Sequence, residues 1–312
     1  MLNVDKVGME KIIIKSNVNK IDNDRNIAKI LLIPSILIIL FLDMYPIIFA
    51  LIVSFQKRSL FDISGIFAGI RNYKIVFRDP IFPTLVKNSI IWTISTTILE
   101  IILGTGVALL LNRNFKFRNI ARGLLLVPYV VPVVCSTLVW KYMFNDIIGL
   151  INYLLTSIHI IRNPISFLSH PSLAMLVVII INVWTYTPFV VINVLASLQN
   201  INVELYEAAR IDGASPWQEF RRITIPSIIP ILVIVTLLRT VWNFQKFEII
   251  WLTTQGGPLN ATTTLPVWVY VNAFLRYDAG IASSVAVIIF IILLLIAMLY
   301  IKVFETTERA LG

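Results

Sequence analysis

The chain has 312 residues, of which 58% are hydrophobic and 14% are charged, and its mean hydropathy is +0.86. Soluble domains average about 45–50% apolar and about 25% charged residues, so this composition excludes a soluble globular protein and indicates an integral membrane protein. The net charge of +9 comes mostly from tails and loops beside apolar segments. This placement suits anionic lipid headgroups and membrane topology, and no pattern typical of nucleic-acid binding accompanies it.

The chain carries few residues of the types that form catalytic or metal sites. Its single cysteine, Cys135, lies in an apolar run, and its two histidines, His159 and His170, are too far apart for a helical metal motif. A Gly-x-x-x-x-Gly-Lys sequence is absent, so no phosphate-binding loop is expected. We therefore expect no catalytic residue, no metal and no cofactor here, and any ATP that drives the protein is bound by another subunit.

Taken in order, the chain begins with a polar segment, 1–29, that is too long and too charged for a cleaved signal peptide and predicts a cytoplasmic tail. Each of the next six apolar segments has roughly the 20 residues needed to cross a bilayer. We expect an all-α, polytopic membrane domain over 30–303, with spans at 30–54, 89–111, 123–143, 172–198, 227–252 and 281–301. Pro128 and Pro132 predict kinks in the third span. A short polar tail, 304–312, follows.

The distribution of lysine and arginine predicts the orientation of these spans. Basic residues are more frequent in the two tails and in the loops after the second and fourth spans than in the loops on the other side. Because cytoplasmic segments are enriched in lysine and arginine, both termini are expected in the cytoplasm. The loop between the first two spans is also basic, so the bias is moderate.

The stretch 203–226, between the fourth and fifth spans, predicts two short helices joined by a sharp turn. Asn202 can cap the first helix, and Gly213 can end it in the left-handed conformation. The second helix starts with a capping box and a first-turn proline, formed by Ser215, Pro216 and Gln218. Pro226 is expected to separate it from the fifth span. A capped helical pair between two spans is more than a connector needs, so we interpret it as a docking element.

The same stretch resembles a family motif. Glu207-Ala208-Ala209, then Gly213, then Ile223-Thr224-Ile225-Pro226 are similar in spacing to the "EAA" loop of permease subunits of binding-protein-dependent ABC importers, with Ile225 in place of the usual leucine. In that family the loop is a cytoplasmic coupling helix that lies in a cleft of the ATPase subunit. The resemblance implies that the residues that couple the chain to the ATPase are Glu207, Ala208, Ala209, Asp212, Gly213, Ile223 and Pro226.

Two outer loops extend the resemblance to about residues 30–303. The segment 67–73, Phe-Ala-Gly-Ile-Arg-Asn-Tyr, resembles the family's short aromatic motif after the first span. The loop containing Gly256-Gly257-Pro258 resembles the sugar-importer branch, in particular the first permease of the maltose and glycerol-phosphate importers. The resemblance implies a permease in the bacterial cytoplasmic membrane that translocates a sugar or oligosaccharide. It also implies four kinds of partner: a second permease, two ATPase subunits that bind the ATP, an external binding protein and the sugar.

Polar side chains inside the spans mark a candidate substrate path, because such residues usually face a partner helix or a water-filled route. Aromatic rings beside amides and hydroxyls suit a sugar, although polar stripes also hold helices together. Resemblance to the maltose-type permeases implies that the substrate contacts are Thr185, Tyr186, Phe189, Arg239, Trp242, Asn243 and Lys246.

Arg239 and Lys246 depart from the family pattern, which has small or neutral residues at these positions. They can pair with Glu100 and Glu248, the interpretation we favour, or they can attract a carboxylated or phosphorylated sugar. Other functions also stay open: an ion-coupled secondary transporter that uses Glu100 and Arg239 as a proton-linked pair, a non-transporting scaffold, or an ABC permease for a peptide or amino acid.

Overall fold

The computed structural model describes residues 31–311, so the predicted tail at 1–29 lies outside the described residues. The chain divides into two units, Met1–Val53 and Ser54–Gly312. In the first unit, the predicted first span is a single apolar helix, Leu31–Ser54, whose last ten residues are α2 (Tyr45–Ser54). A π-helical turn, η1 (Leu40–Met44), precedes α2. It lies directly before Pro46, which cannot donate the backbone hydrogen bond that a regular α-helix requires there.

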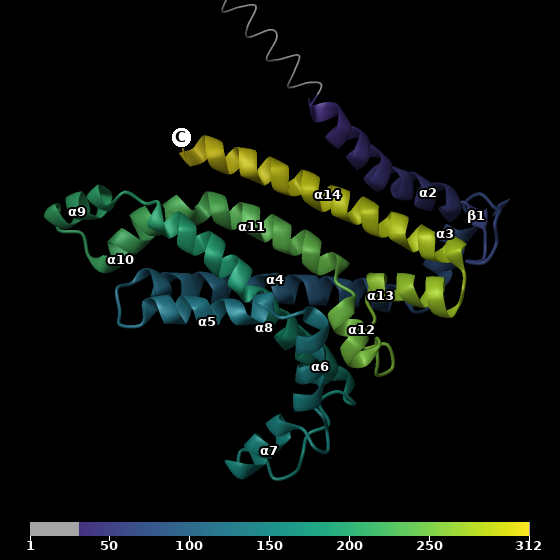
Figure 1. Ribbon diagram of the computed structural model, residues 1–312, viewed down its shortest axis with the longest axis horizontal. Coiled ribbons are helices and arrows are strands. Elements are labelled where there is room, and N and C mark those ends of the chain that lie inside the picture. Colours follow the sequence, from purple (N-terminus) through teal and green to yellow (C-terminus); the bar gives the residue numbers. More distant parts are fainter. Residues whose placement is uncertain (1–30, 312) are drawn as a thin grey trace, which may run out of the picture. The chain divides into compact units, whose positions relative to one another are not determined.

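The second unit is almost entirely helical (Figure 1). Its strands, β1 (Gln56–Lys57) and β2 (Ile66–Phe67), form one short antiparallel pair with Gln56 opposite Phe67. Its helices in the part of the chain described are α3 (Arg71–Arg78), α4 (Phe82–Asn112), α5 (Arg118–Val130), α6 (Val133–Met143), α7 (Leu150–Ser157), α8 (Pro171–Gln199), α9 (Val203–Ile211), α10 (Pro216–Glu219), η2 (Phe220–Thr224), α11 (Ile225–Gln245), α12 (Glu248–Thr254), α13 (Leu265–Tyr270), η3 (Val271–Leu275) and α14 (Ala279–Leu311).

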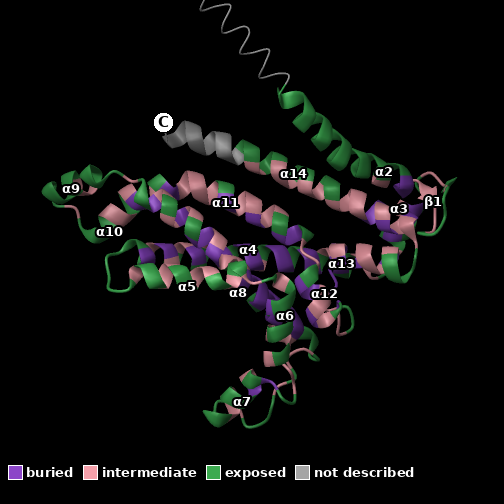
Figure 2. Ribbon diagram, viewed as in Figure 1, coloured by how far each residue is buried: buried purple, intermediate pink, exposed green. Residues whose placement is uncertain are grey.

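The core of this unit lies between α4, α8 and α11 (Figure 2). Apolar side chains from all three helices pack in one buried cluster that includes Ala108, Val190, Val194 and Val235. Gly104 lets α4 come close to α8, because a Cβ atom at this position would lie 2.6 Å from the Val190 side chain. The close packing fixes the relative positions of the three helices, which also carry most of the polar residues predicted inside the spans.

The predicted third span consists of two helices separated by a break. The bend between them is larger than the kinks that its prolines predicted. Helices α5 and α6 meet at an angle of 93°. Val131 is extended, because a proline disfavours helical geometry in the residue before it, and Pro132 is the N-cap residue of α6. Within the described residues, five helices are long and apolar enough to cross a membrane, or six if this bent pair is one span.

The fifth span also differs from the prediction, at both ends. Pro226 does not separate the second short helix from the span, because α10 continues through the π-helical turn η2 into α11. Pro226 lacks a backbone N–H, and the π-turn before it lets the helix continue without that hydrogen bond. Residues 216–245 are therefore one apolar helix of 30 residues. The helix then ends at Gln245, since Lys246 is extended, and 248–254 form the separate helix α12. At the other end of the chain, α14 continues to Leu311, through most of the predicted tail at 304–312.

Candidate functional site

The 203–226 stretch forms the predicted helical pair, α9 and α10, and its local signals are confirmed. The Asn202 side chain accepts a hydrogen bond from the backbone N–H of Glu204 at 3.0 Å. Gly213 follows α9 with a φ of +80°, the left-handed conformation that glycine adopts without a steric cost. Ser215 and Gln218 form a reciprocal capping box at the start of α10. We name α9, the turn and α10, residues 203–219, the hairpin.

Two side-chain contacts hold the hairpin in one shape. Arg210 Nε donates to Glu219 Oε1 at 2.9 Å, which ties α9 to α10. Glu219 raises the pKa of Arg210 by hydrogen bonding and by its charge, so the arginine stays protonated. Tyr206 Oη and Thr224 Oγ1 lie 2.8 Å apart and join α9 to η2. The hairpin therefore moves with the start of the fifth span, because α9 is linked to both α10 and η2.

The hairpin is exposed, although it is rich in apolar side chains. No residue of α9 or α10 is buried, and the hairpin lies at one end of the long helices of the second unit (Figures 1 and 2). Ile211 is 86% exposed and Trp217 is 67% exposed. Exposed apolar side chains gathered in this way mark protein-interaction surfaces. A cavity of about 270 Å³ between the two helices is lined by residues that include Ala209, Asp212, Gly213, Gln218 and Ile223.

The structure divides the seven predicted coupling residues into two groups. Glu207, Ala208, Asp212 and Gly213 are exposed on the hairpin. The other three are half-buried: Ala209, on the inner side of α9, and Ile223 and Pro226, at the base of the fifth span. The exposed group is available to a partner protein, and the half-buried group joins the hairpin to the span.

A buried polar network connects α4, α8 and α11 inside the core. Arg239 donates to Glu100 through Nε (2.6 Å, to Oε2) and Nη2 (2.8 Å, to Oε1). Asn182 Nδ2 donates to Glu100 Oε1 at 2.8 Å, and Asn243 Nδ2 donates to Oε2 at 3.0 Å. Glu100 therefore accepts four hydrogen bonds, and it is 0% exposed while Arg239 is 1% exposed. The predicted pairing of Arg239 with Glu100 is confirmed.

The network includes or adjoins three residues of the predicted substrate path. Arg239 and Asn243 belong to the network, and Asn243 also donates to Thr97. Thr185 is buried on α8, where its hydroxyl donates to the Ile181 carbonyl oxygen at 2.8 Å. The side chains of these three residues are buried between the helices, and their contact with substrate stays a prediction.

The other four predicted residues gather on one partly exposed face, together with a residue that the sequence did not single out. The Tyr186 and Phe189 rings of α8 lie beside the Tyr129 ring of α5, with both centroid separations 6.3 Å. Trp242 of α11 contacts Phe189 at 5.2 Å between centroids. We name Tyr129, Tyr186, Phe189 and Trp242 the aromatic face. Tyr129 lies beside Pro128, just before the break in the third span. This position next to a proline is the sequence feature that could have identified Tyr129 as a candidate residue.

Lys246 lies on the aromatic face and not in the predicted ion pair. Its Nζ donates to Tyr186 Oη at 2.7 Å and lies 4.3 Å from the centroid of the Tyr186 ring. Glu248 begins α12, is exposed, and accepts a hydrogen bond from the Phe247 backbone N–H at 3.4 Å. The predicted Lys246–Glu248 pair is therefore wrong: the break after α11 turns the lysine toward Tyr186, while the glutamate is the exposed first residue of α12.

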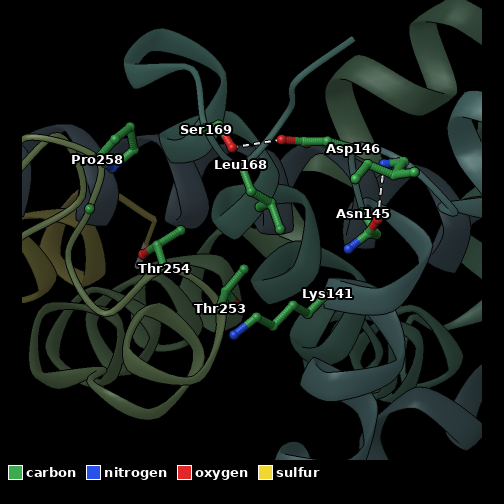
Figure 3. Close-up of a pocket in the computed structure, with 10 residues that line it drawn as sticks. Lys141, Asn145, Asp146, Leu168, Ser169, Thr253, Thr254 and Pro258 are labelled. Carbon is green, nitrogen blue, oxygen red and sulfur yellow. Dashed lines mark hydrogen bonds between the residues drawn. The ribbon is translucent and has the colours of Figure 1, made fainter. Parts of the chain in front are cut away.

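A second cavity, of about 520 Å³, lies among the loops that follow the third and fifth spans (Figure 3). Ser169 donates to Asp146 Oδ2 at 2.6 Å, and Lys141 Nζ donates to the Leu252 carbonyl oxygen at 3.0 Å. Thr253, Thr254 and Pro258 line the opposite wall. The cavity lies near the N-terminal end of α8 (Pro171–Gln199), whereas the hairpin follows the C-terminal end of the same helix. The lining of the cavity combines polar side chains such as Lys141 and Asp146 with apolar ones such as Ile147 and Leu168.

Residues 100–309 match the family described as binding-protein-dependent transport system inner membrane components. The chain is 34% identical over 279 residues to the inner membrane ABC transporter permease protein YcjO of Escherichia coli, covering 89% of this chain and 94% of YcjO. It is 33% identical over 282 residues to the trehalose/maltose transport system permease protein MalF of Thermococcus litoralis, covering 90% and 94%. The sulfoquinovosyl glycerol permease SmoG of Agrobacterium fabrum is 31% identical over 288 residues, with coverage of 91% and 92%.

The fold also matches a solved structure. A chain of a bacterial ABC transporter involved in the import of the acidic polysaccharide alginate superposes with a TM-score of 0.80 at 22% sequence identity. The match covers 93% of this chain and 99% of that chain.

Proposed function

Because the chain belongs to the family of binding-protein-dependent transport system inner membrane components, we propose that it is a permease subunit of an ATP-driven importer that carries a sugar or oligosaccharide. The exposed, capped hairpin is the observation that carries this proposal, since a rigid apolar surface at one end of the spans suits an ATPase subunit. The sugar class is supported by relatives whose names specify trehalose, maltose and sulfoquinovosyl glycerol. The other partners are a second permease and an external binding protein.

The hairpin couples ATP hydrolysis in the partner subunits to movement of the spans. Glu207 is exposed on α9 and makes the first contact with the ATPase. Because α10 runs through η2 into α11, a displacement of the hairpin reaches Trp242 along one continuous helix. Tilting this helix opens the path alternately to each side. In this proposal the protein is a multi-pass component of the bacterial cytoplasmic membrane, with the hairpin and both termini in the cytoplasm.

The aromatic face forms this chain's part of the sugar path. The rings of Tyr186, Phe189 and Trp242 offer apolar surfaces to the faces of a sugar ring, and Lys246 and the Tyr186 hydroxyl offer hydrogen bonds. The cavity of Figure 3 lies on the side away from the ATPase-docking hairpin, which is the side where a binding protein delivers the sugar.

Replacing Trp242 with alanine is expected to raise the half-saturating concentration of sugar-loaded binding protein for uptake, or lower the uptake rate, by about tenfold. An aromatic contact of this kind contributes about 0.5–1.5 kcal/mol beyond its buried area. Uptake of radiolabelled sugar into proteoliposomes that contain the complete transporter measures the effect. Phe290→Ala is the matched control, because Phe290 is an exposed aromatic residue of α14 outside the aromatic face. Equal effects of the two substitutions would contradict the assignment of this face.

An ion-coupled carrier is the alternative that the buried charges raise. In such a carrier Glu100 would exchange a proton during transport, which requires a free lone pair and access to water. Its two oxygens accept four hydrogen bonds and its exposed fraction is 0%. The network therefore favours a structural role. Uptake that a proton gradient drives in proteoliposomes without ATP would favour the carrier instead.

A further inference from the structure

We propose that the substrate carries an anionic group, a carboxylate, sulfonate or phosphate, and that Lys246 together with the Tyr186 hydroxyl binds this group. The inference rests on the proposed function, because it specifies the class of sugar that the aromatic face takes. It goes beyond that function, since a permease for a neutral sugar needs no cation at this position. Three observations carry it: the state of Glu100, the surroundings of Lys246 and the location of the cluster.

Glu100 makes no hydrogen bond and no salt bridge with Lys246. A carboxylate has about four lone-pair sites. All four are filled at Glu100: two by Arg239, one by Asn182 and one by Asn243. Glu100 and Arg239 thus compensate each other within the core. The three charged groups of this region, one carboxylate and two cations, leave one positive charge, and it lies at Lys246.

The surroundings of Lys246 supply donors and a π-face. Among the described residues, its Nζ makes one hydrogen bond, to Tyr186 Oη, and no carboxylate lies within salt-bridge distance. An ammonium group has three N–H donors, so two remain, and the Tyr186 O–H remains as a third. The Arg239 guanidinium lies 4.7 Å from the centroid of the same Tyr186 ring, on which Lys246 also lies at 4.3 Å. Three donors beside the one uncompensated cation, Lys246, suit the oxygens of an anion.

The position of the cluster makes this charge costly without a counter-ion. Lys246 is half-buried in the extended break between α11 and α12, beside the partly exposed aromatic rings. A cation within a spanning segment usually faces a partner charge or a water-filled path. The C-terminal end of α11 favours a cation through its partial negative charge but supplies no full counter-charge. An anionic group on the sugar supplies one, while the sugar ring stacks on the aromatic face.

The test is equilibrium dialysis of the complete transporter, purified in detergent with its partner permease and ATPases but without the binding protein. The radiolabelled probes are glucose, glucuronate, glucose 6-phosphate and 6-deoxy-6-sulfoglucose. We expect at least one anionic probe to bind about tenfold or more tightly than glucose. Lys246→Gln should weaken that anion about 10- to 100-fold and weaken glucose much less, because charge-assisted hydrogen bonds are about twice as strong as neutral ones. Lys246→Arg should retain most of the preference.

Lys87→Gln is the matched control, since Lys87 is exposed on α4 away from the aromatic face and its substitution should leave all four affinities unchanged. The inference is overturned if glucose binds as tightly as every anion, or if Lys246→Gln weakens glucose and the anions equally. It is also overturned if that variant changes only the amount of co-purified anionic lipid, which would assign the cation to a lipid phosphate. The proposed function is judged separately, by whether sugar-loaded binding protein stimulates ATP hydrolysis, and it can hold for a neutral sugar.

Discussion

Glu100→Ala is expected to destabilise the protein by about 3–5 kcal/mol, the cost of leaving one member of a buried ion pair without its partner. Arg239 would then keep its charge at 1% exposure, with Asn243 as its one remaining hydrogen-bond partner among the described residues. The amide groups of Asn182 and Asn243 would also lose an acceptor. Thermal unfolding of the detergent-purified protein, followed by tryptophan fluorescence and by monodisperse elution, measures the loss.

The double variant Glu100→Ala with Arg239→Ala distinguishes two causes of lost stability: the unpaired buried charge and the cavity that the substitutions leave. Because it removes both charges, it should be more stable than Glu100→Ala alone, although Arg239 has also been removed. Glu248→Ala is the matched control, since Glu248 is an exposed carboxylate at the start of α12 and its loss should cost little. If Glu100→Ala unfolds at the same temperature as Glu248→Ala, the network does not hold the three spans together.

Gly213→Val is expected to reduce ATP-dependent sugar uptake by at least tenfold while the protein still folds and reaches the membrane. Gly213 has a φ of +80°, and a Cβ atom there would meet nothing within 4 Å. The effect therefore comes from the backbone alone, because the left-handed conformation costs an L-residue roughly 1–2 kcal/mol and a β-branched residue more. The turn would open and displace α9 from α10, which separates the coupling surface from the fifth span.

The chain offers a matched control for this prediction. Gly123 lies in α5 with helical geometry, and a Cβ atom there also meets nothing within 4 Å. Gly123→Val adds the same side chain to open space without a demand for positive φ, so uptake should stay near the wild-type level. Equal loss in both variants, or unchanged uptake in Gly213→Val, would remove the turn from the coupling mechanism. Uptake and ATP hydrolysis are measured on the same proteoliposomes.

Features set by neighbouring residues were predictable from the sequence. The Asn202 cap, the left-handed Gly213 and the Ser215–Gln218 capping box each depend on residues at most three apart, and the structure confirms all of them. The apolar segments likewise predicted the helices long enough to cross a membrane, since length and composition decide this property. The effect of each proline on its helix was less predictable. Pro132 lies in the break between α5 and α6, which meet at 93°, whereas Pro226 lies in a helix that continues from a π-turn into α11, and packing decides between these outcomes.

The site depended on contacts between distant parts of the chain, and here the sequence left alternatives open. Glu100 and Arg239 are 139 residues apart, so their pairing follows only from the packing of α4 against α11. Arg239 and Lys246 lie two helical turns apart and look alike in sequence, yet one is buried in an ion pair and the other lies on the aromatic face. The end of α11 at Gln245 separates their roles, because it turns Lys246 toward Tyr186.

The central claim, that the hairpin docks an ATPase subunit, is tested most directly by co-purification. The chain is purified in mild detergent together with candidate second-permease and ATPase subunits, as the wild type and as Glu207→Ala with Gly213→Val. Glu207 is exposed on α9 and Gly213 shapes the turn, so the double variant alters the surface and leaves the spans intact. We predict that the wild type retains the ATPase and that the double variant loses it while keeping the second permease. Absence of an ATPase from the wild type, or its full retention by the variant, would contradict the account.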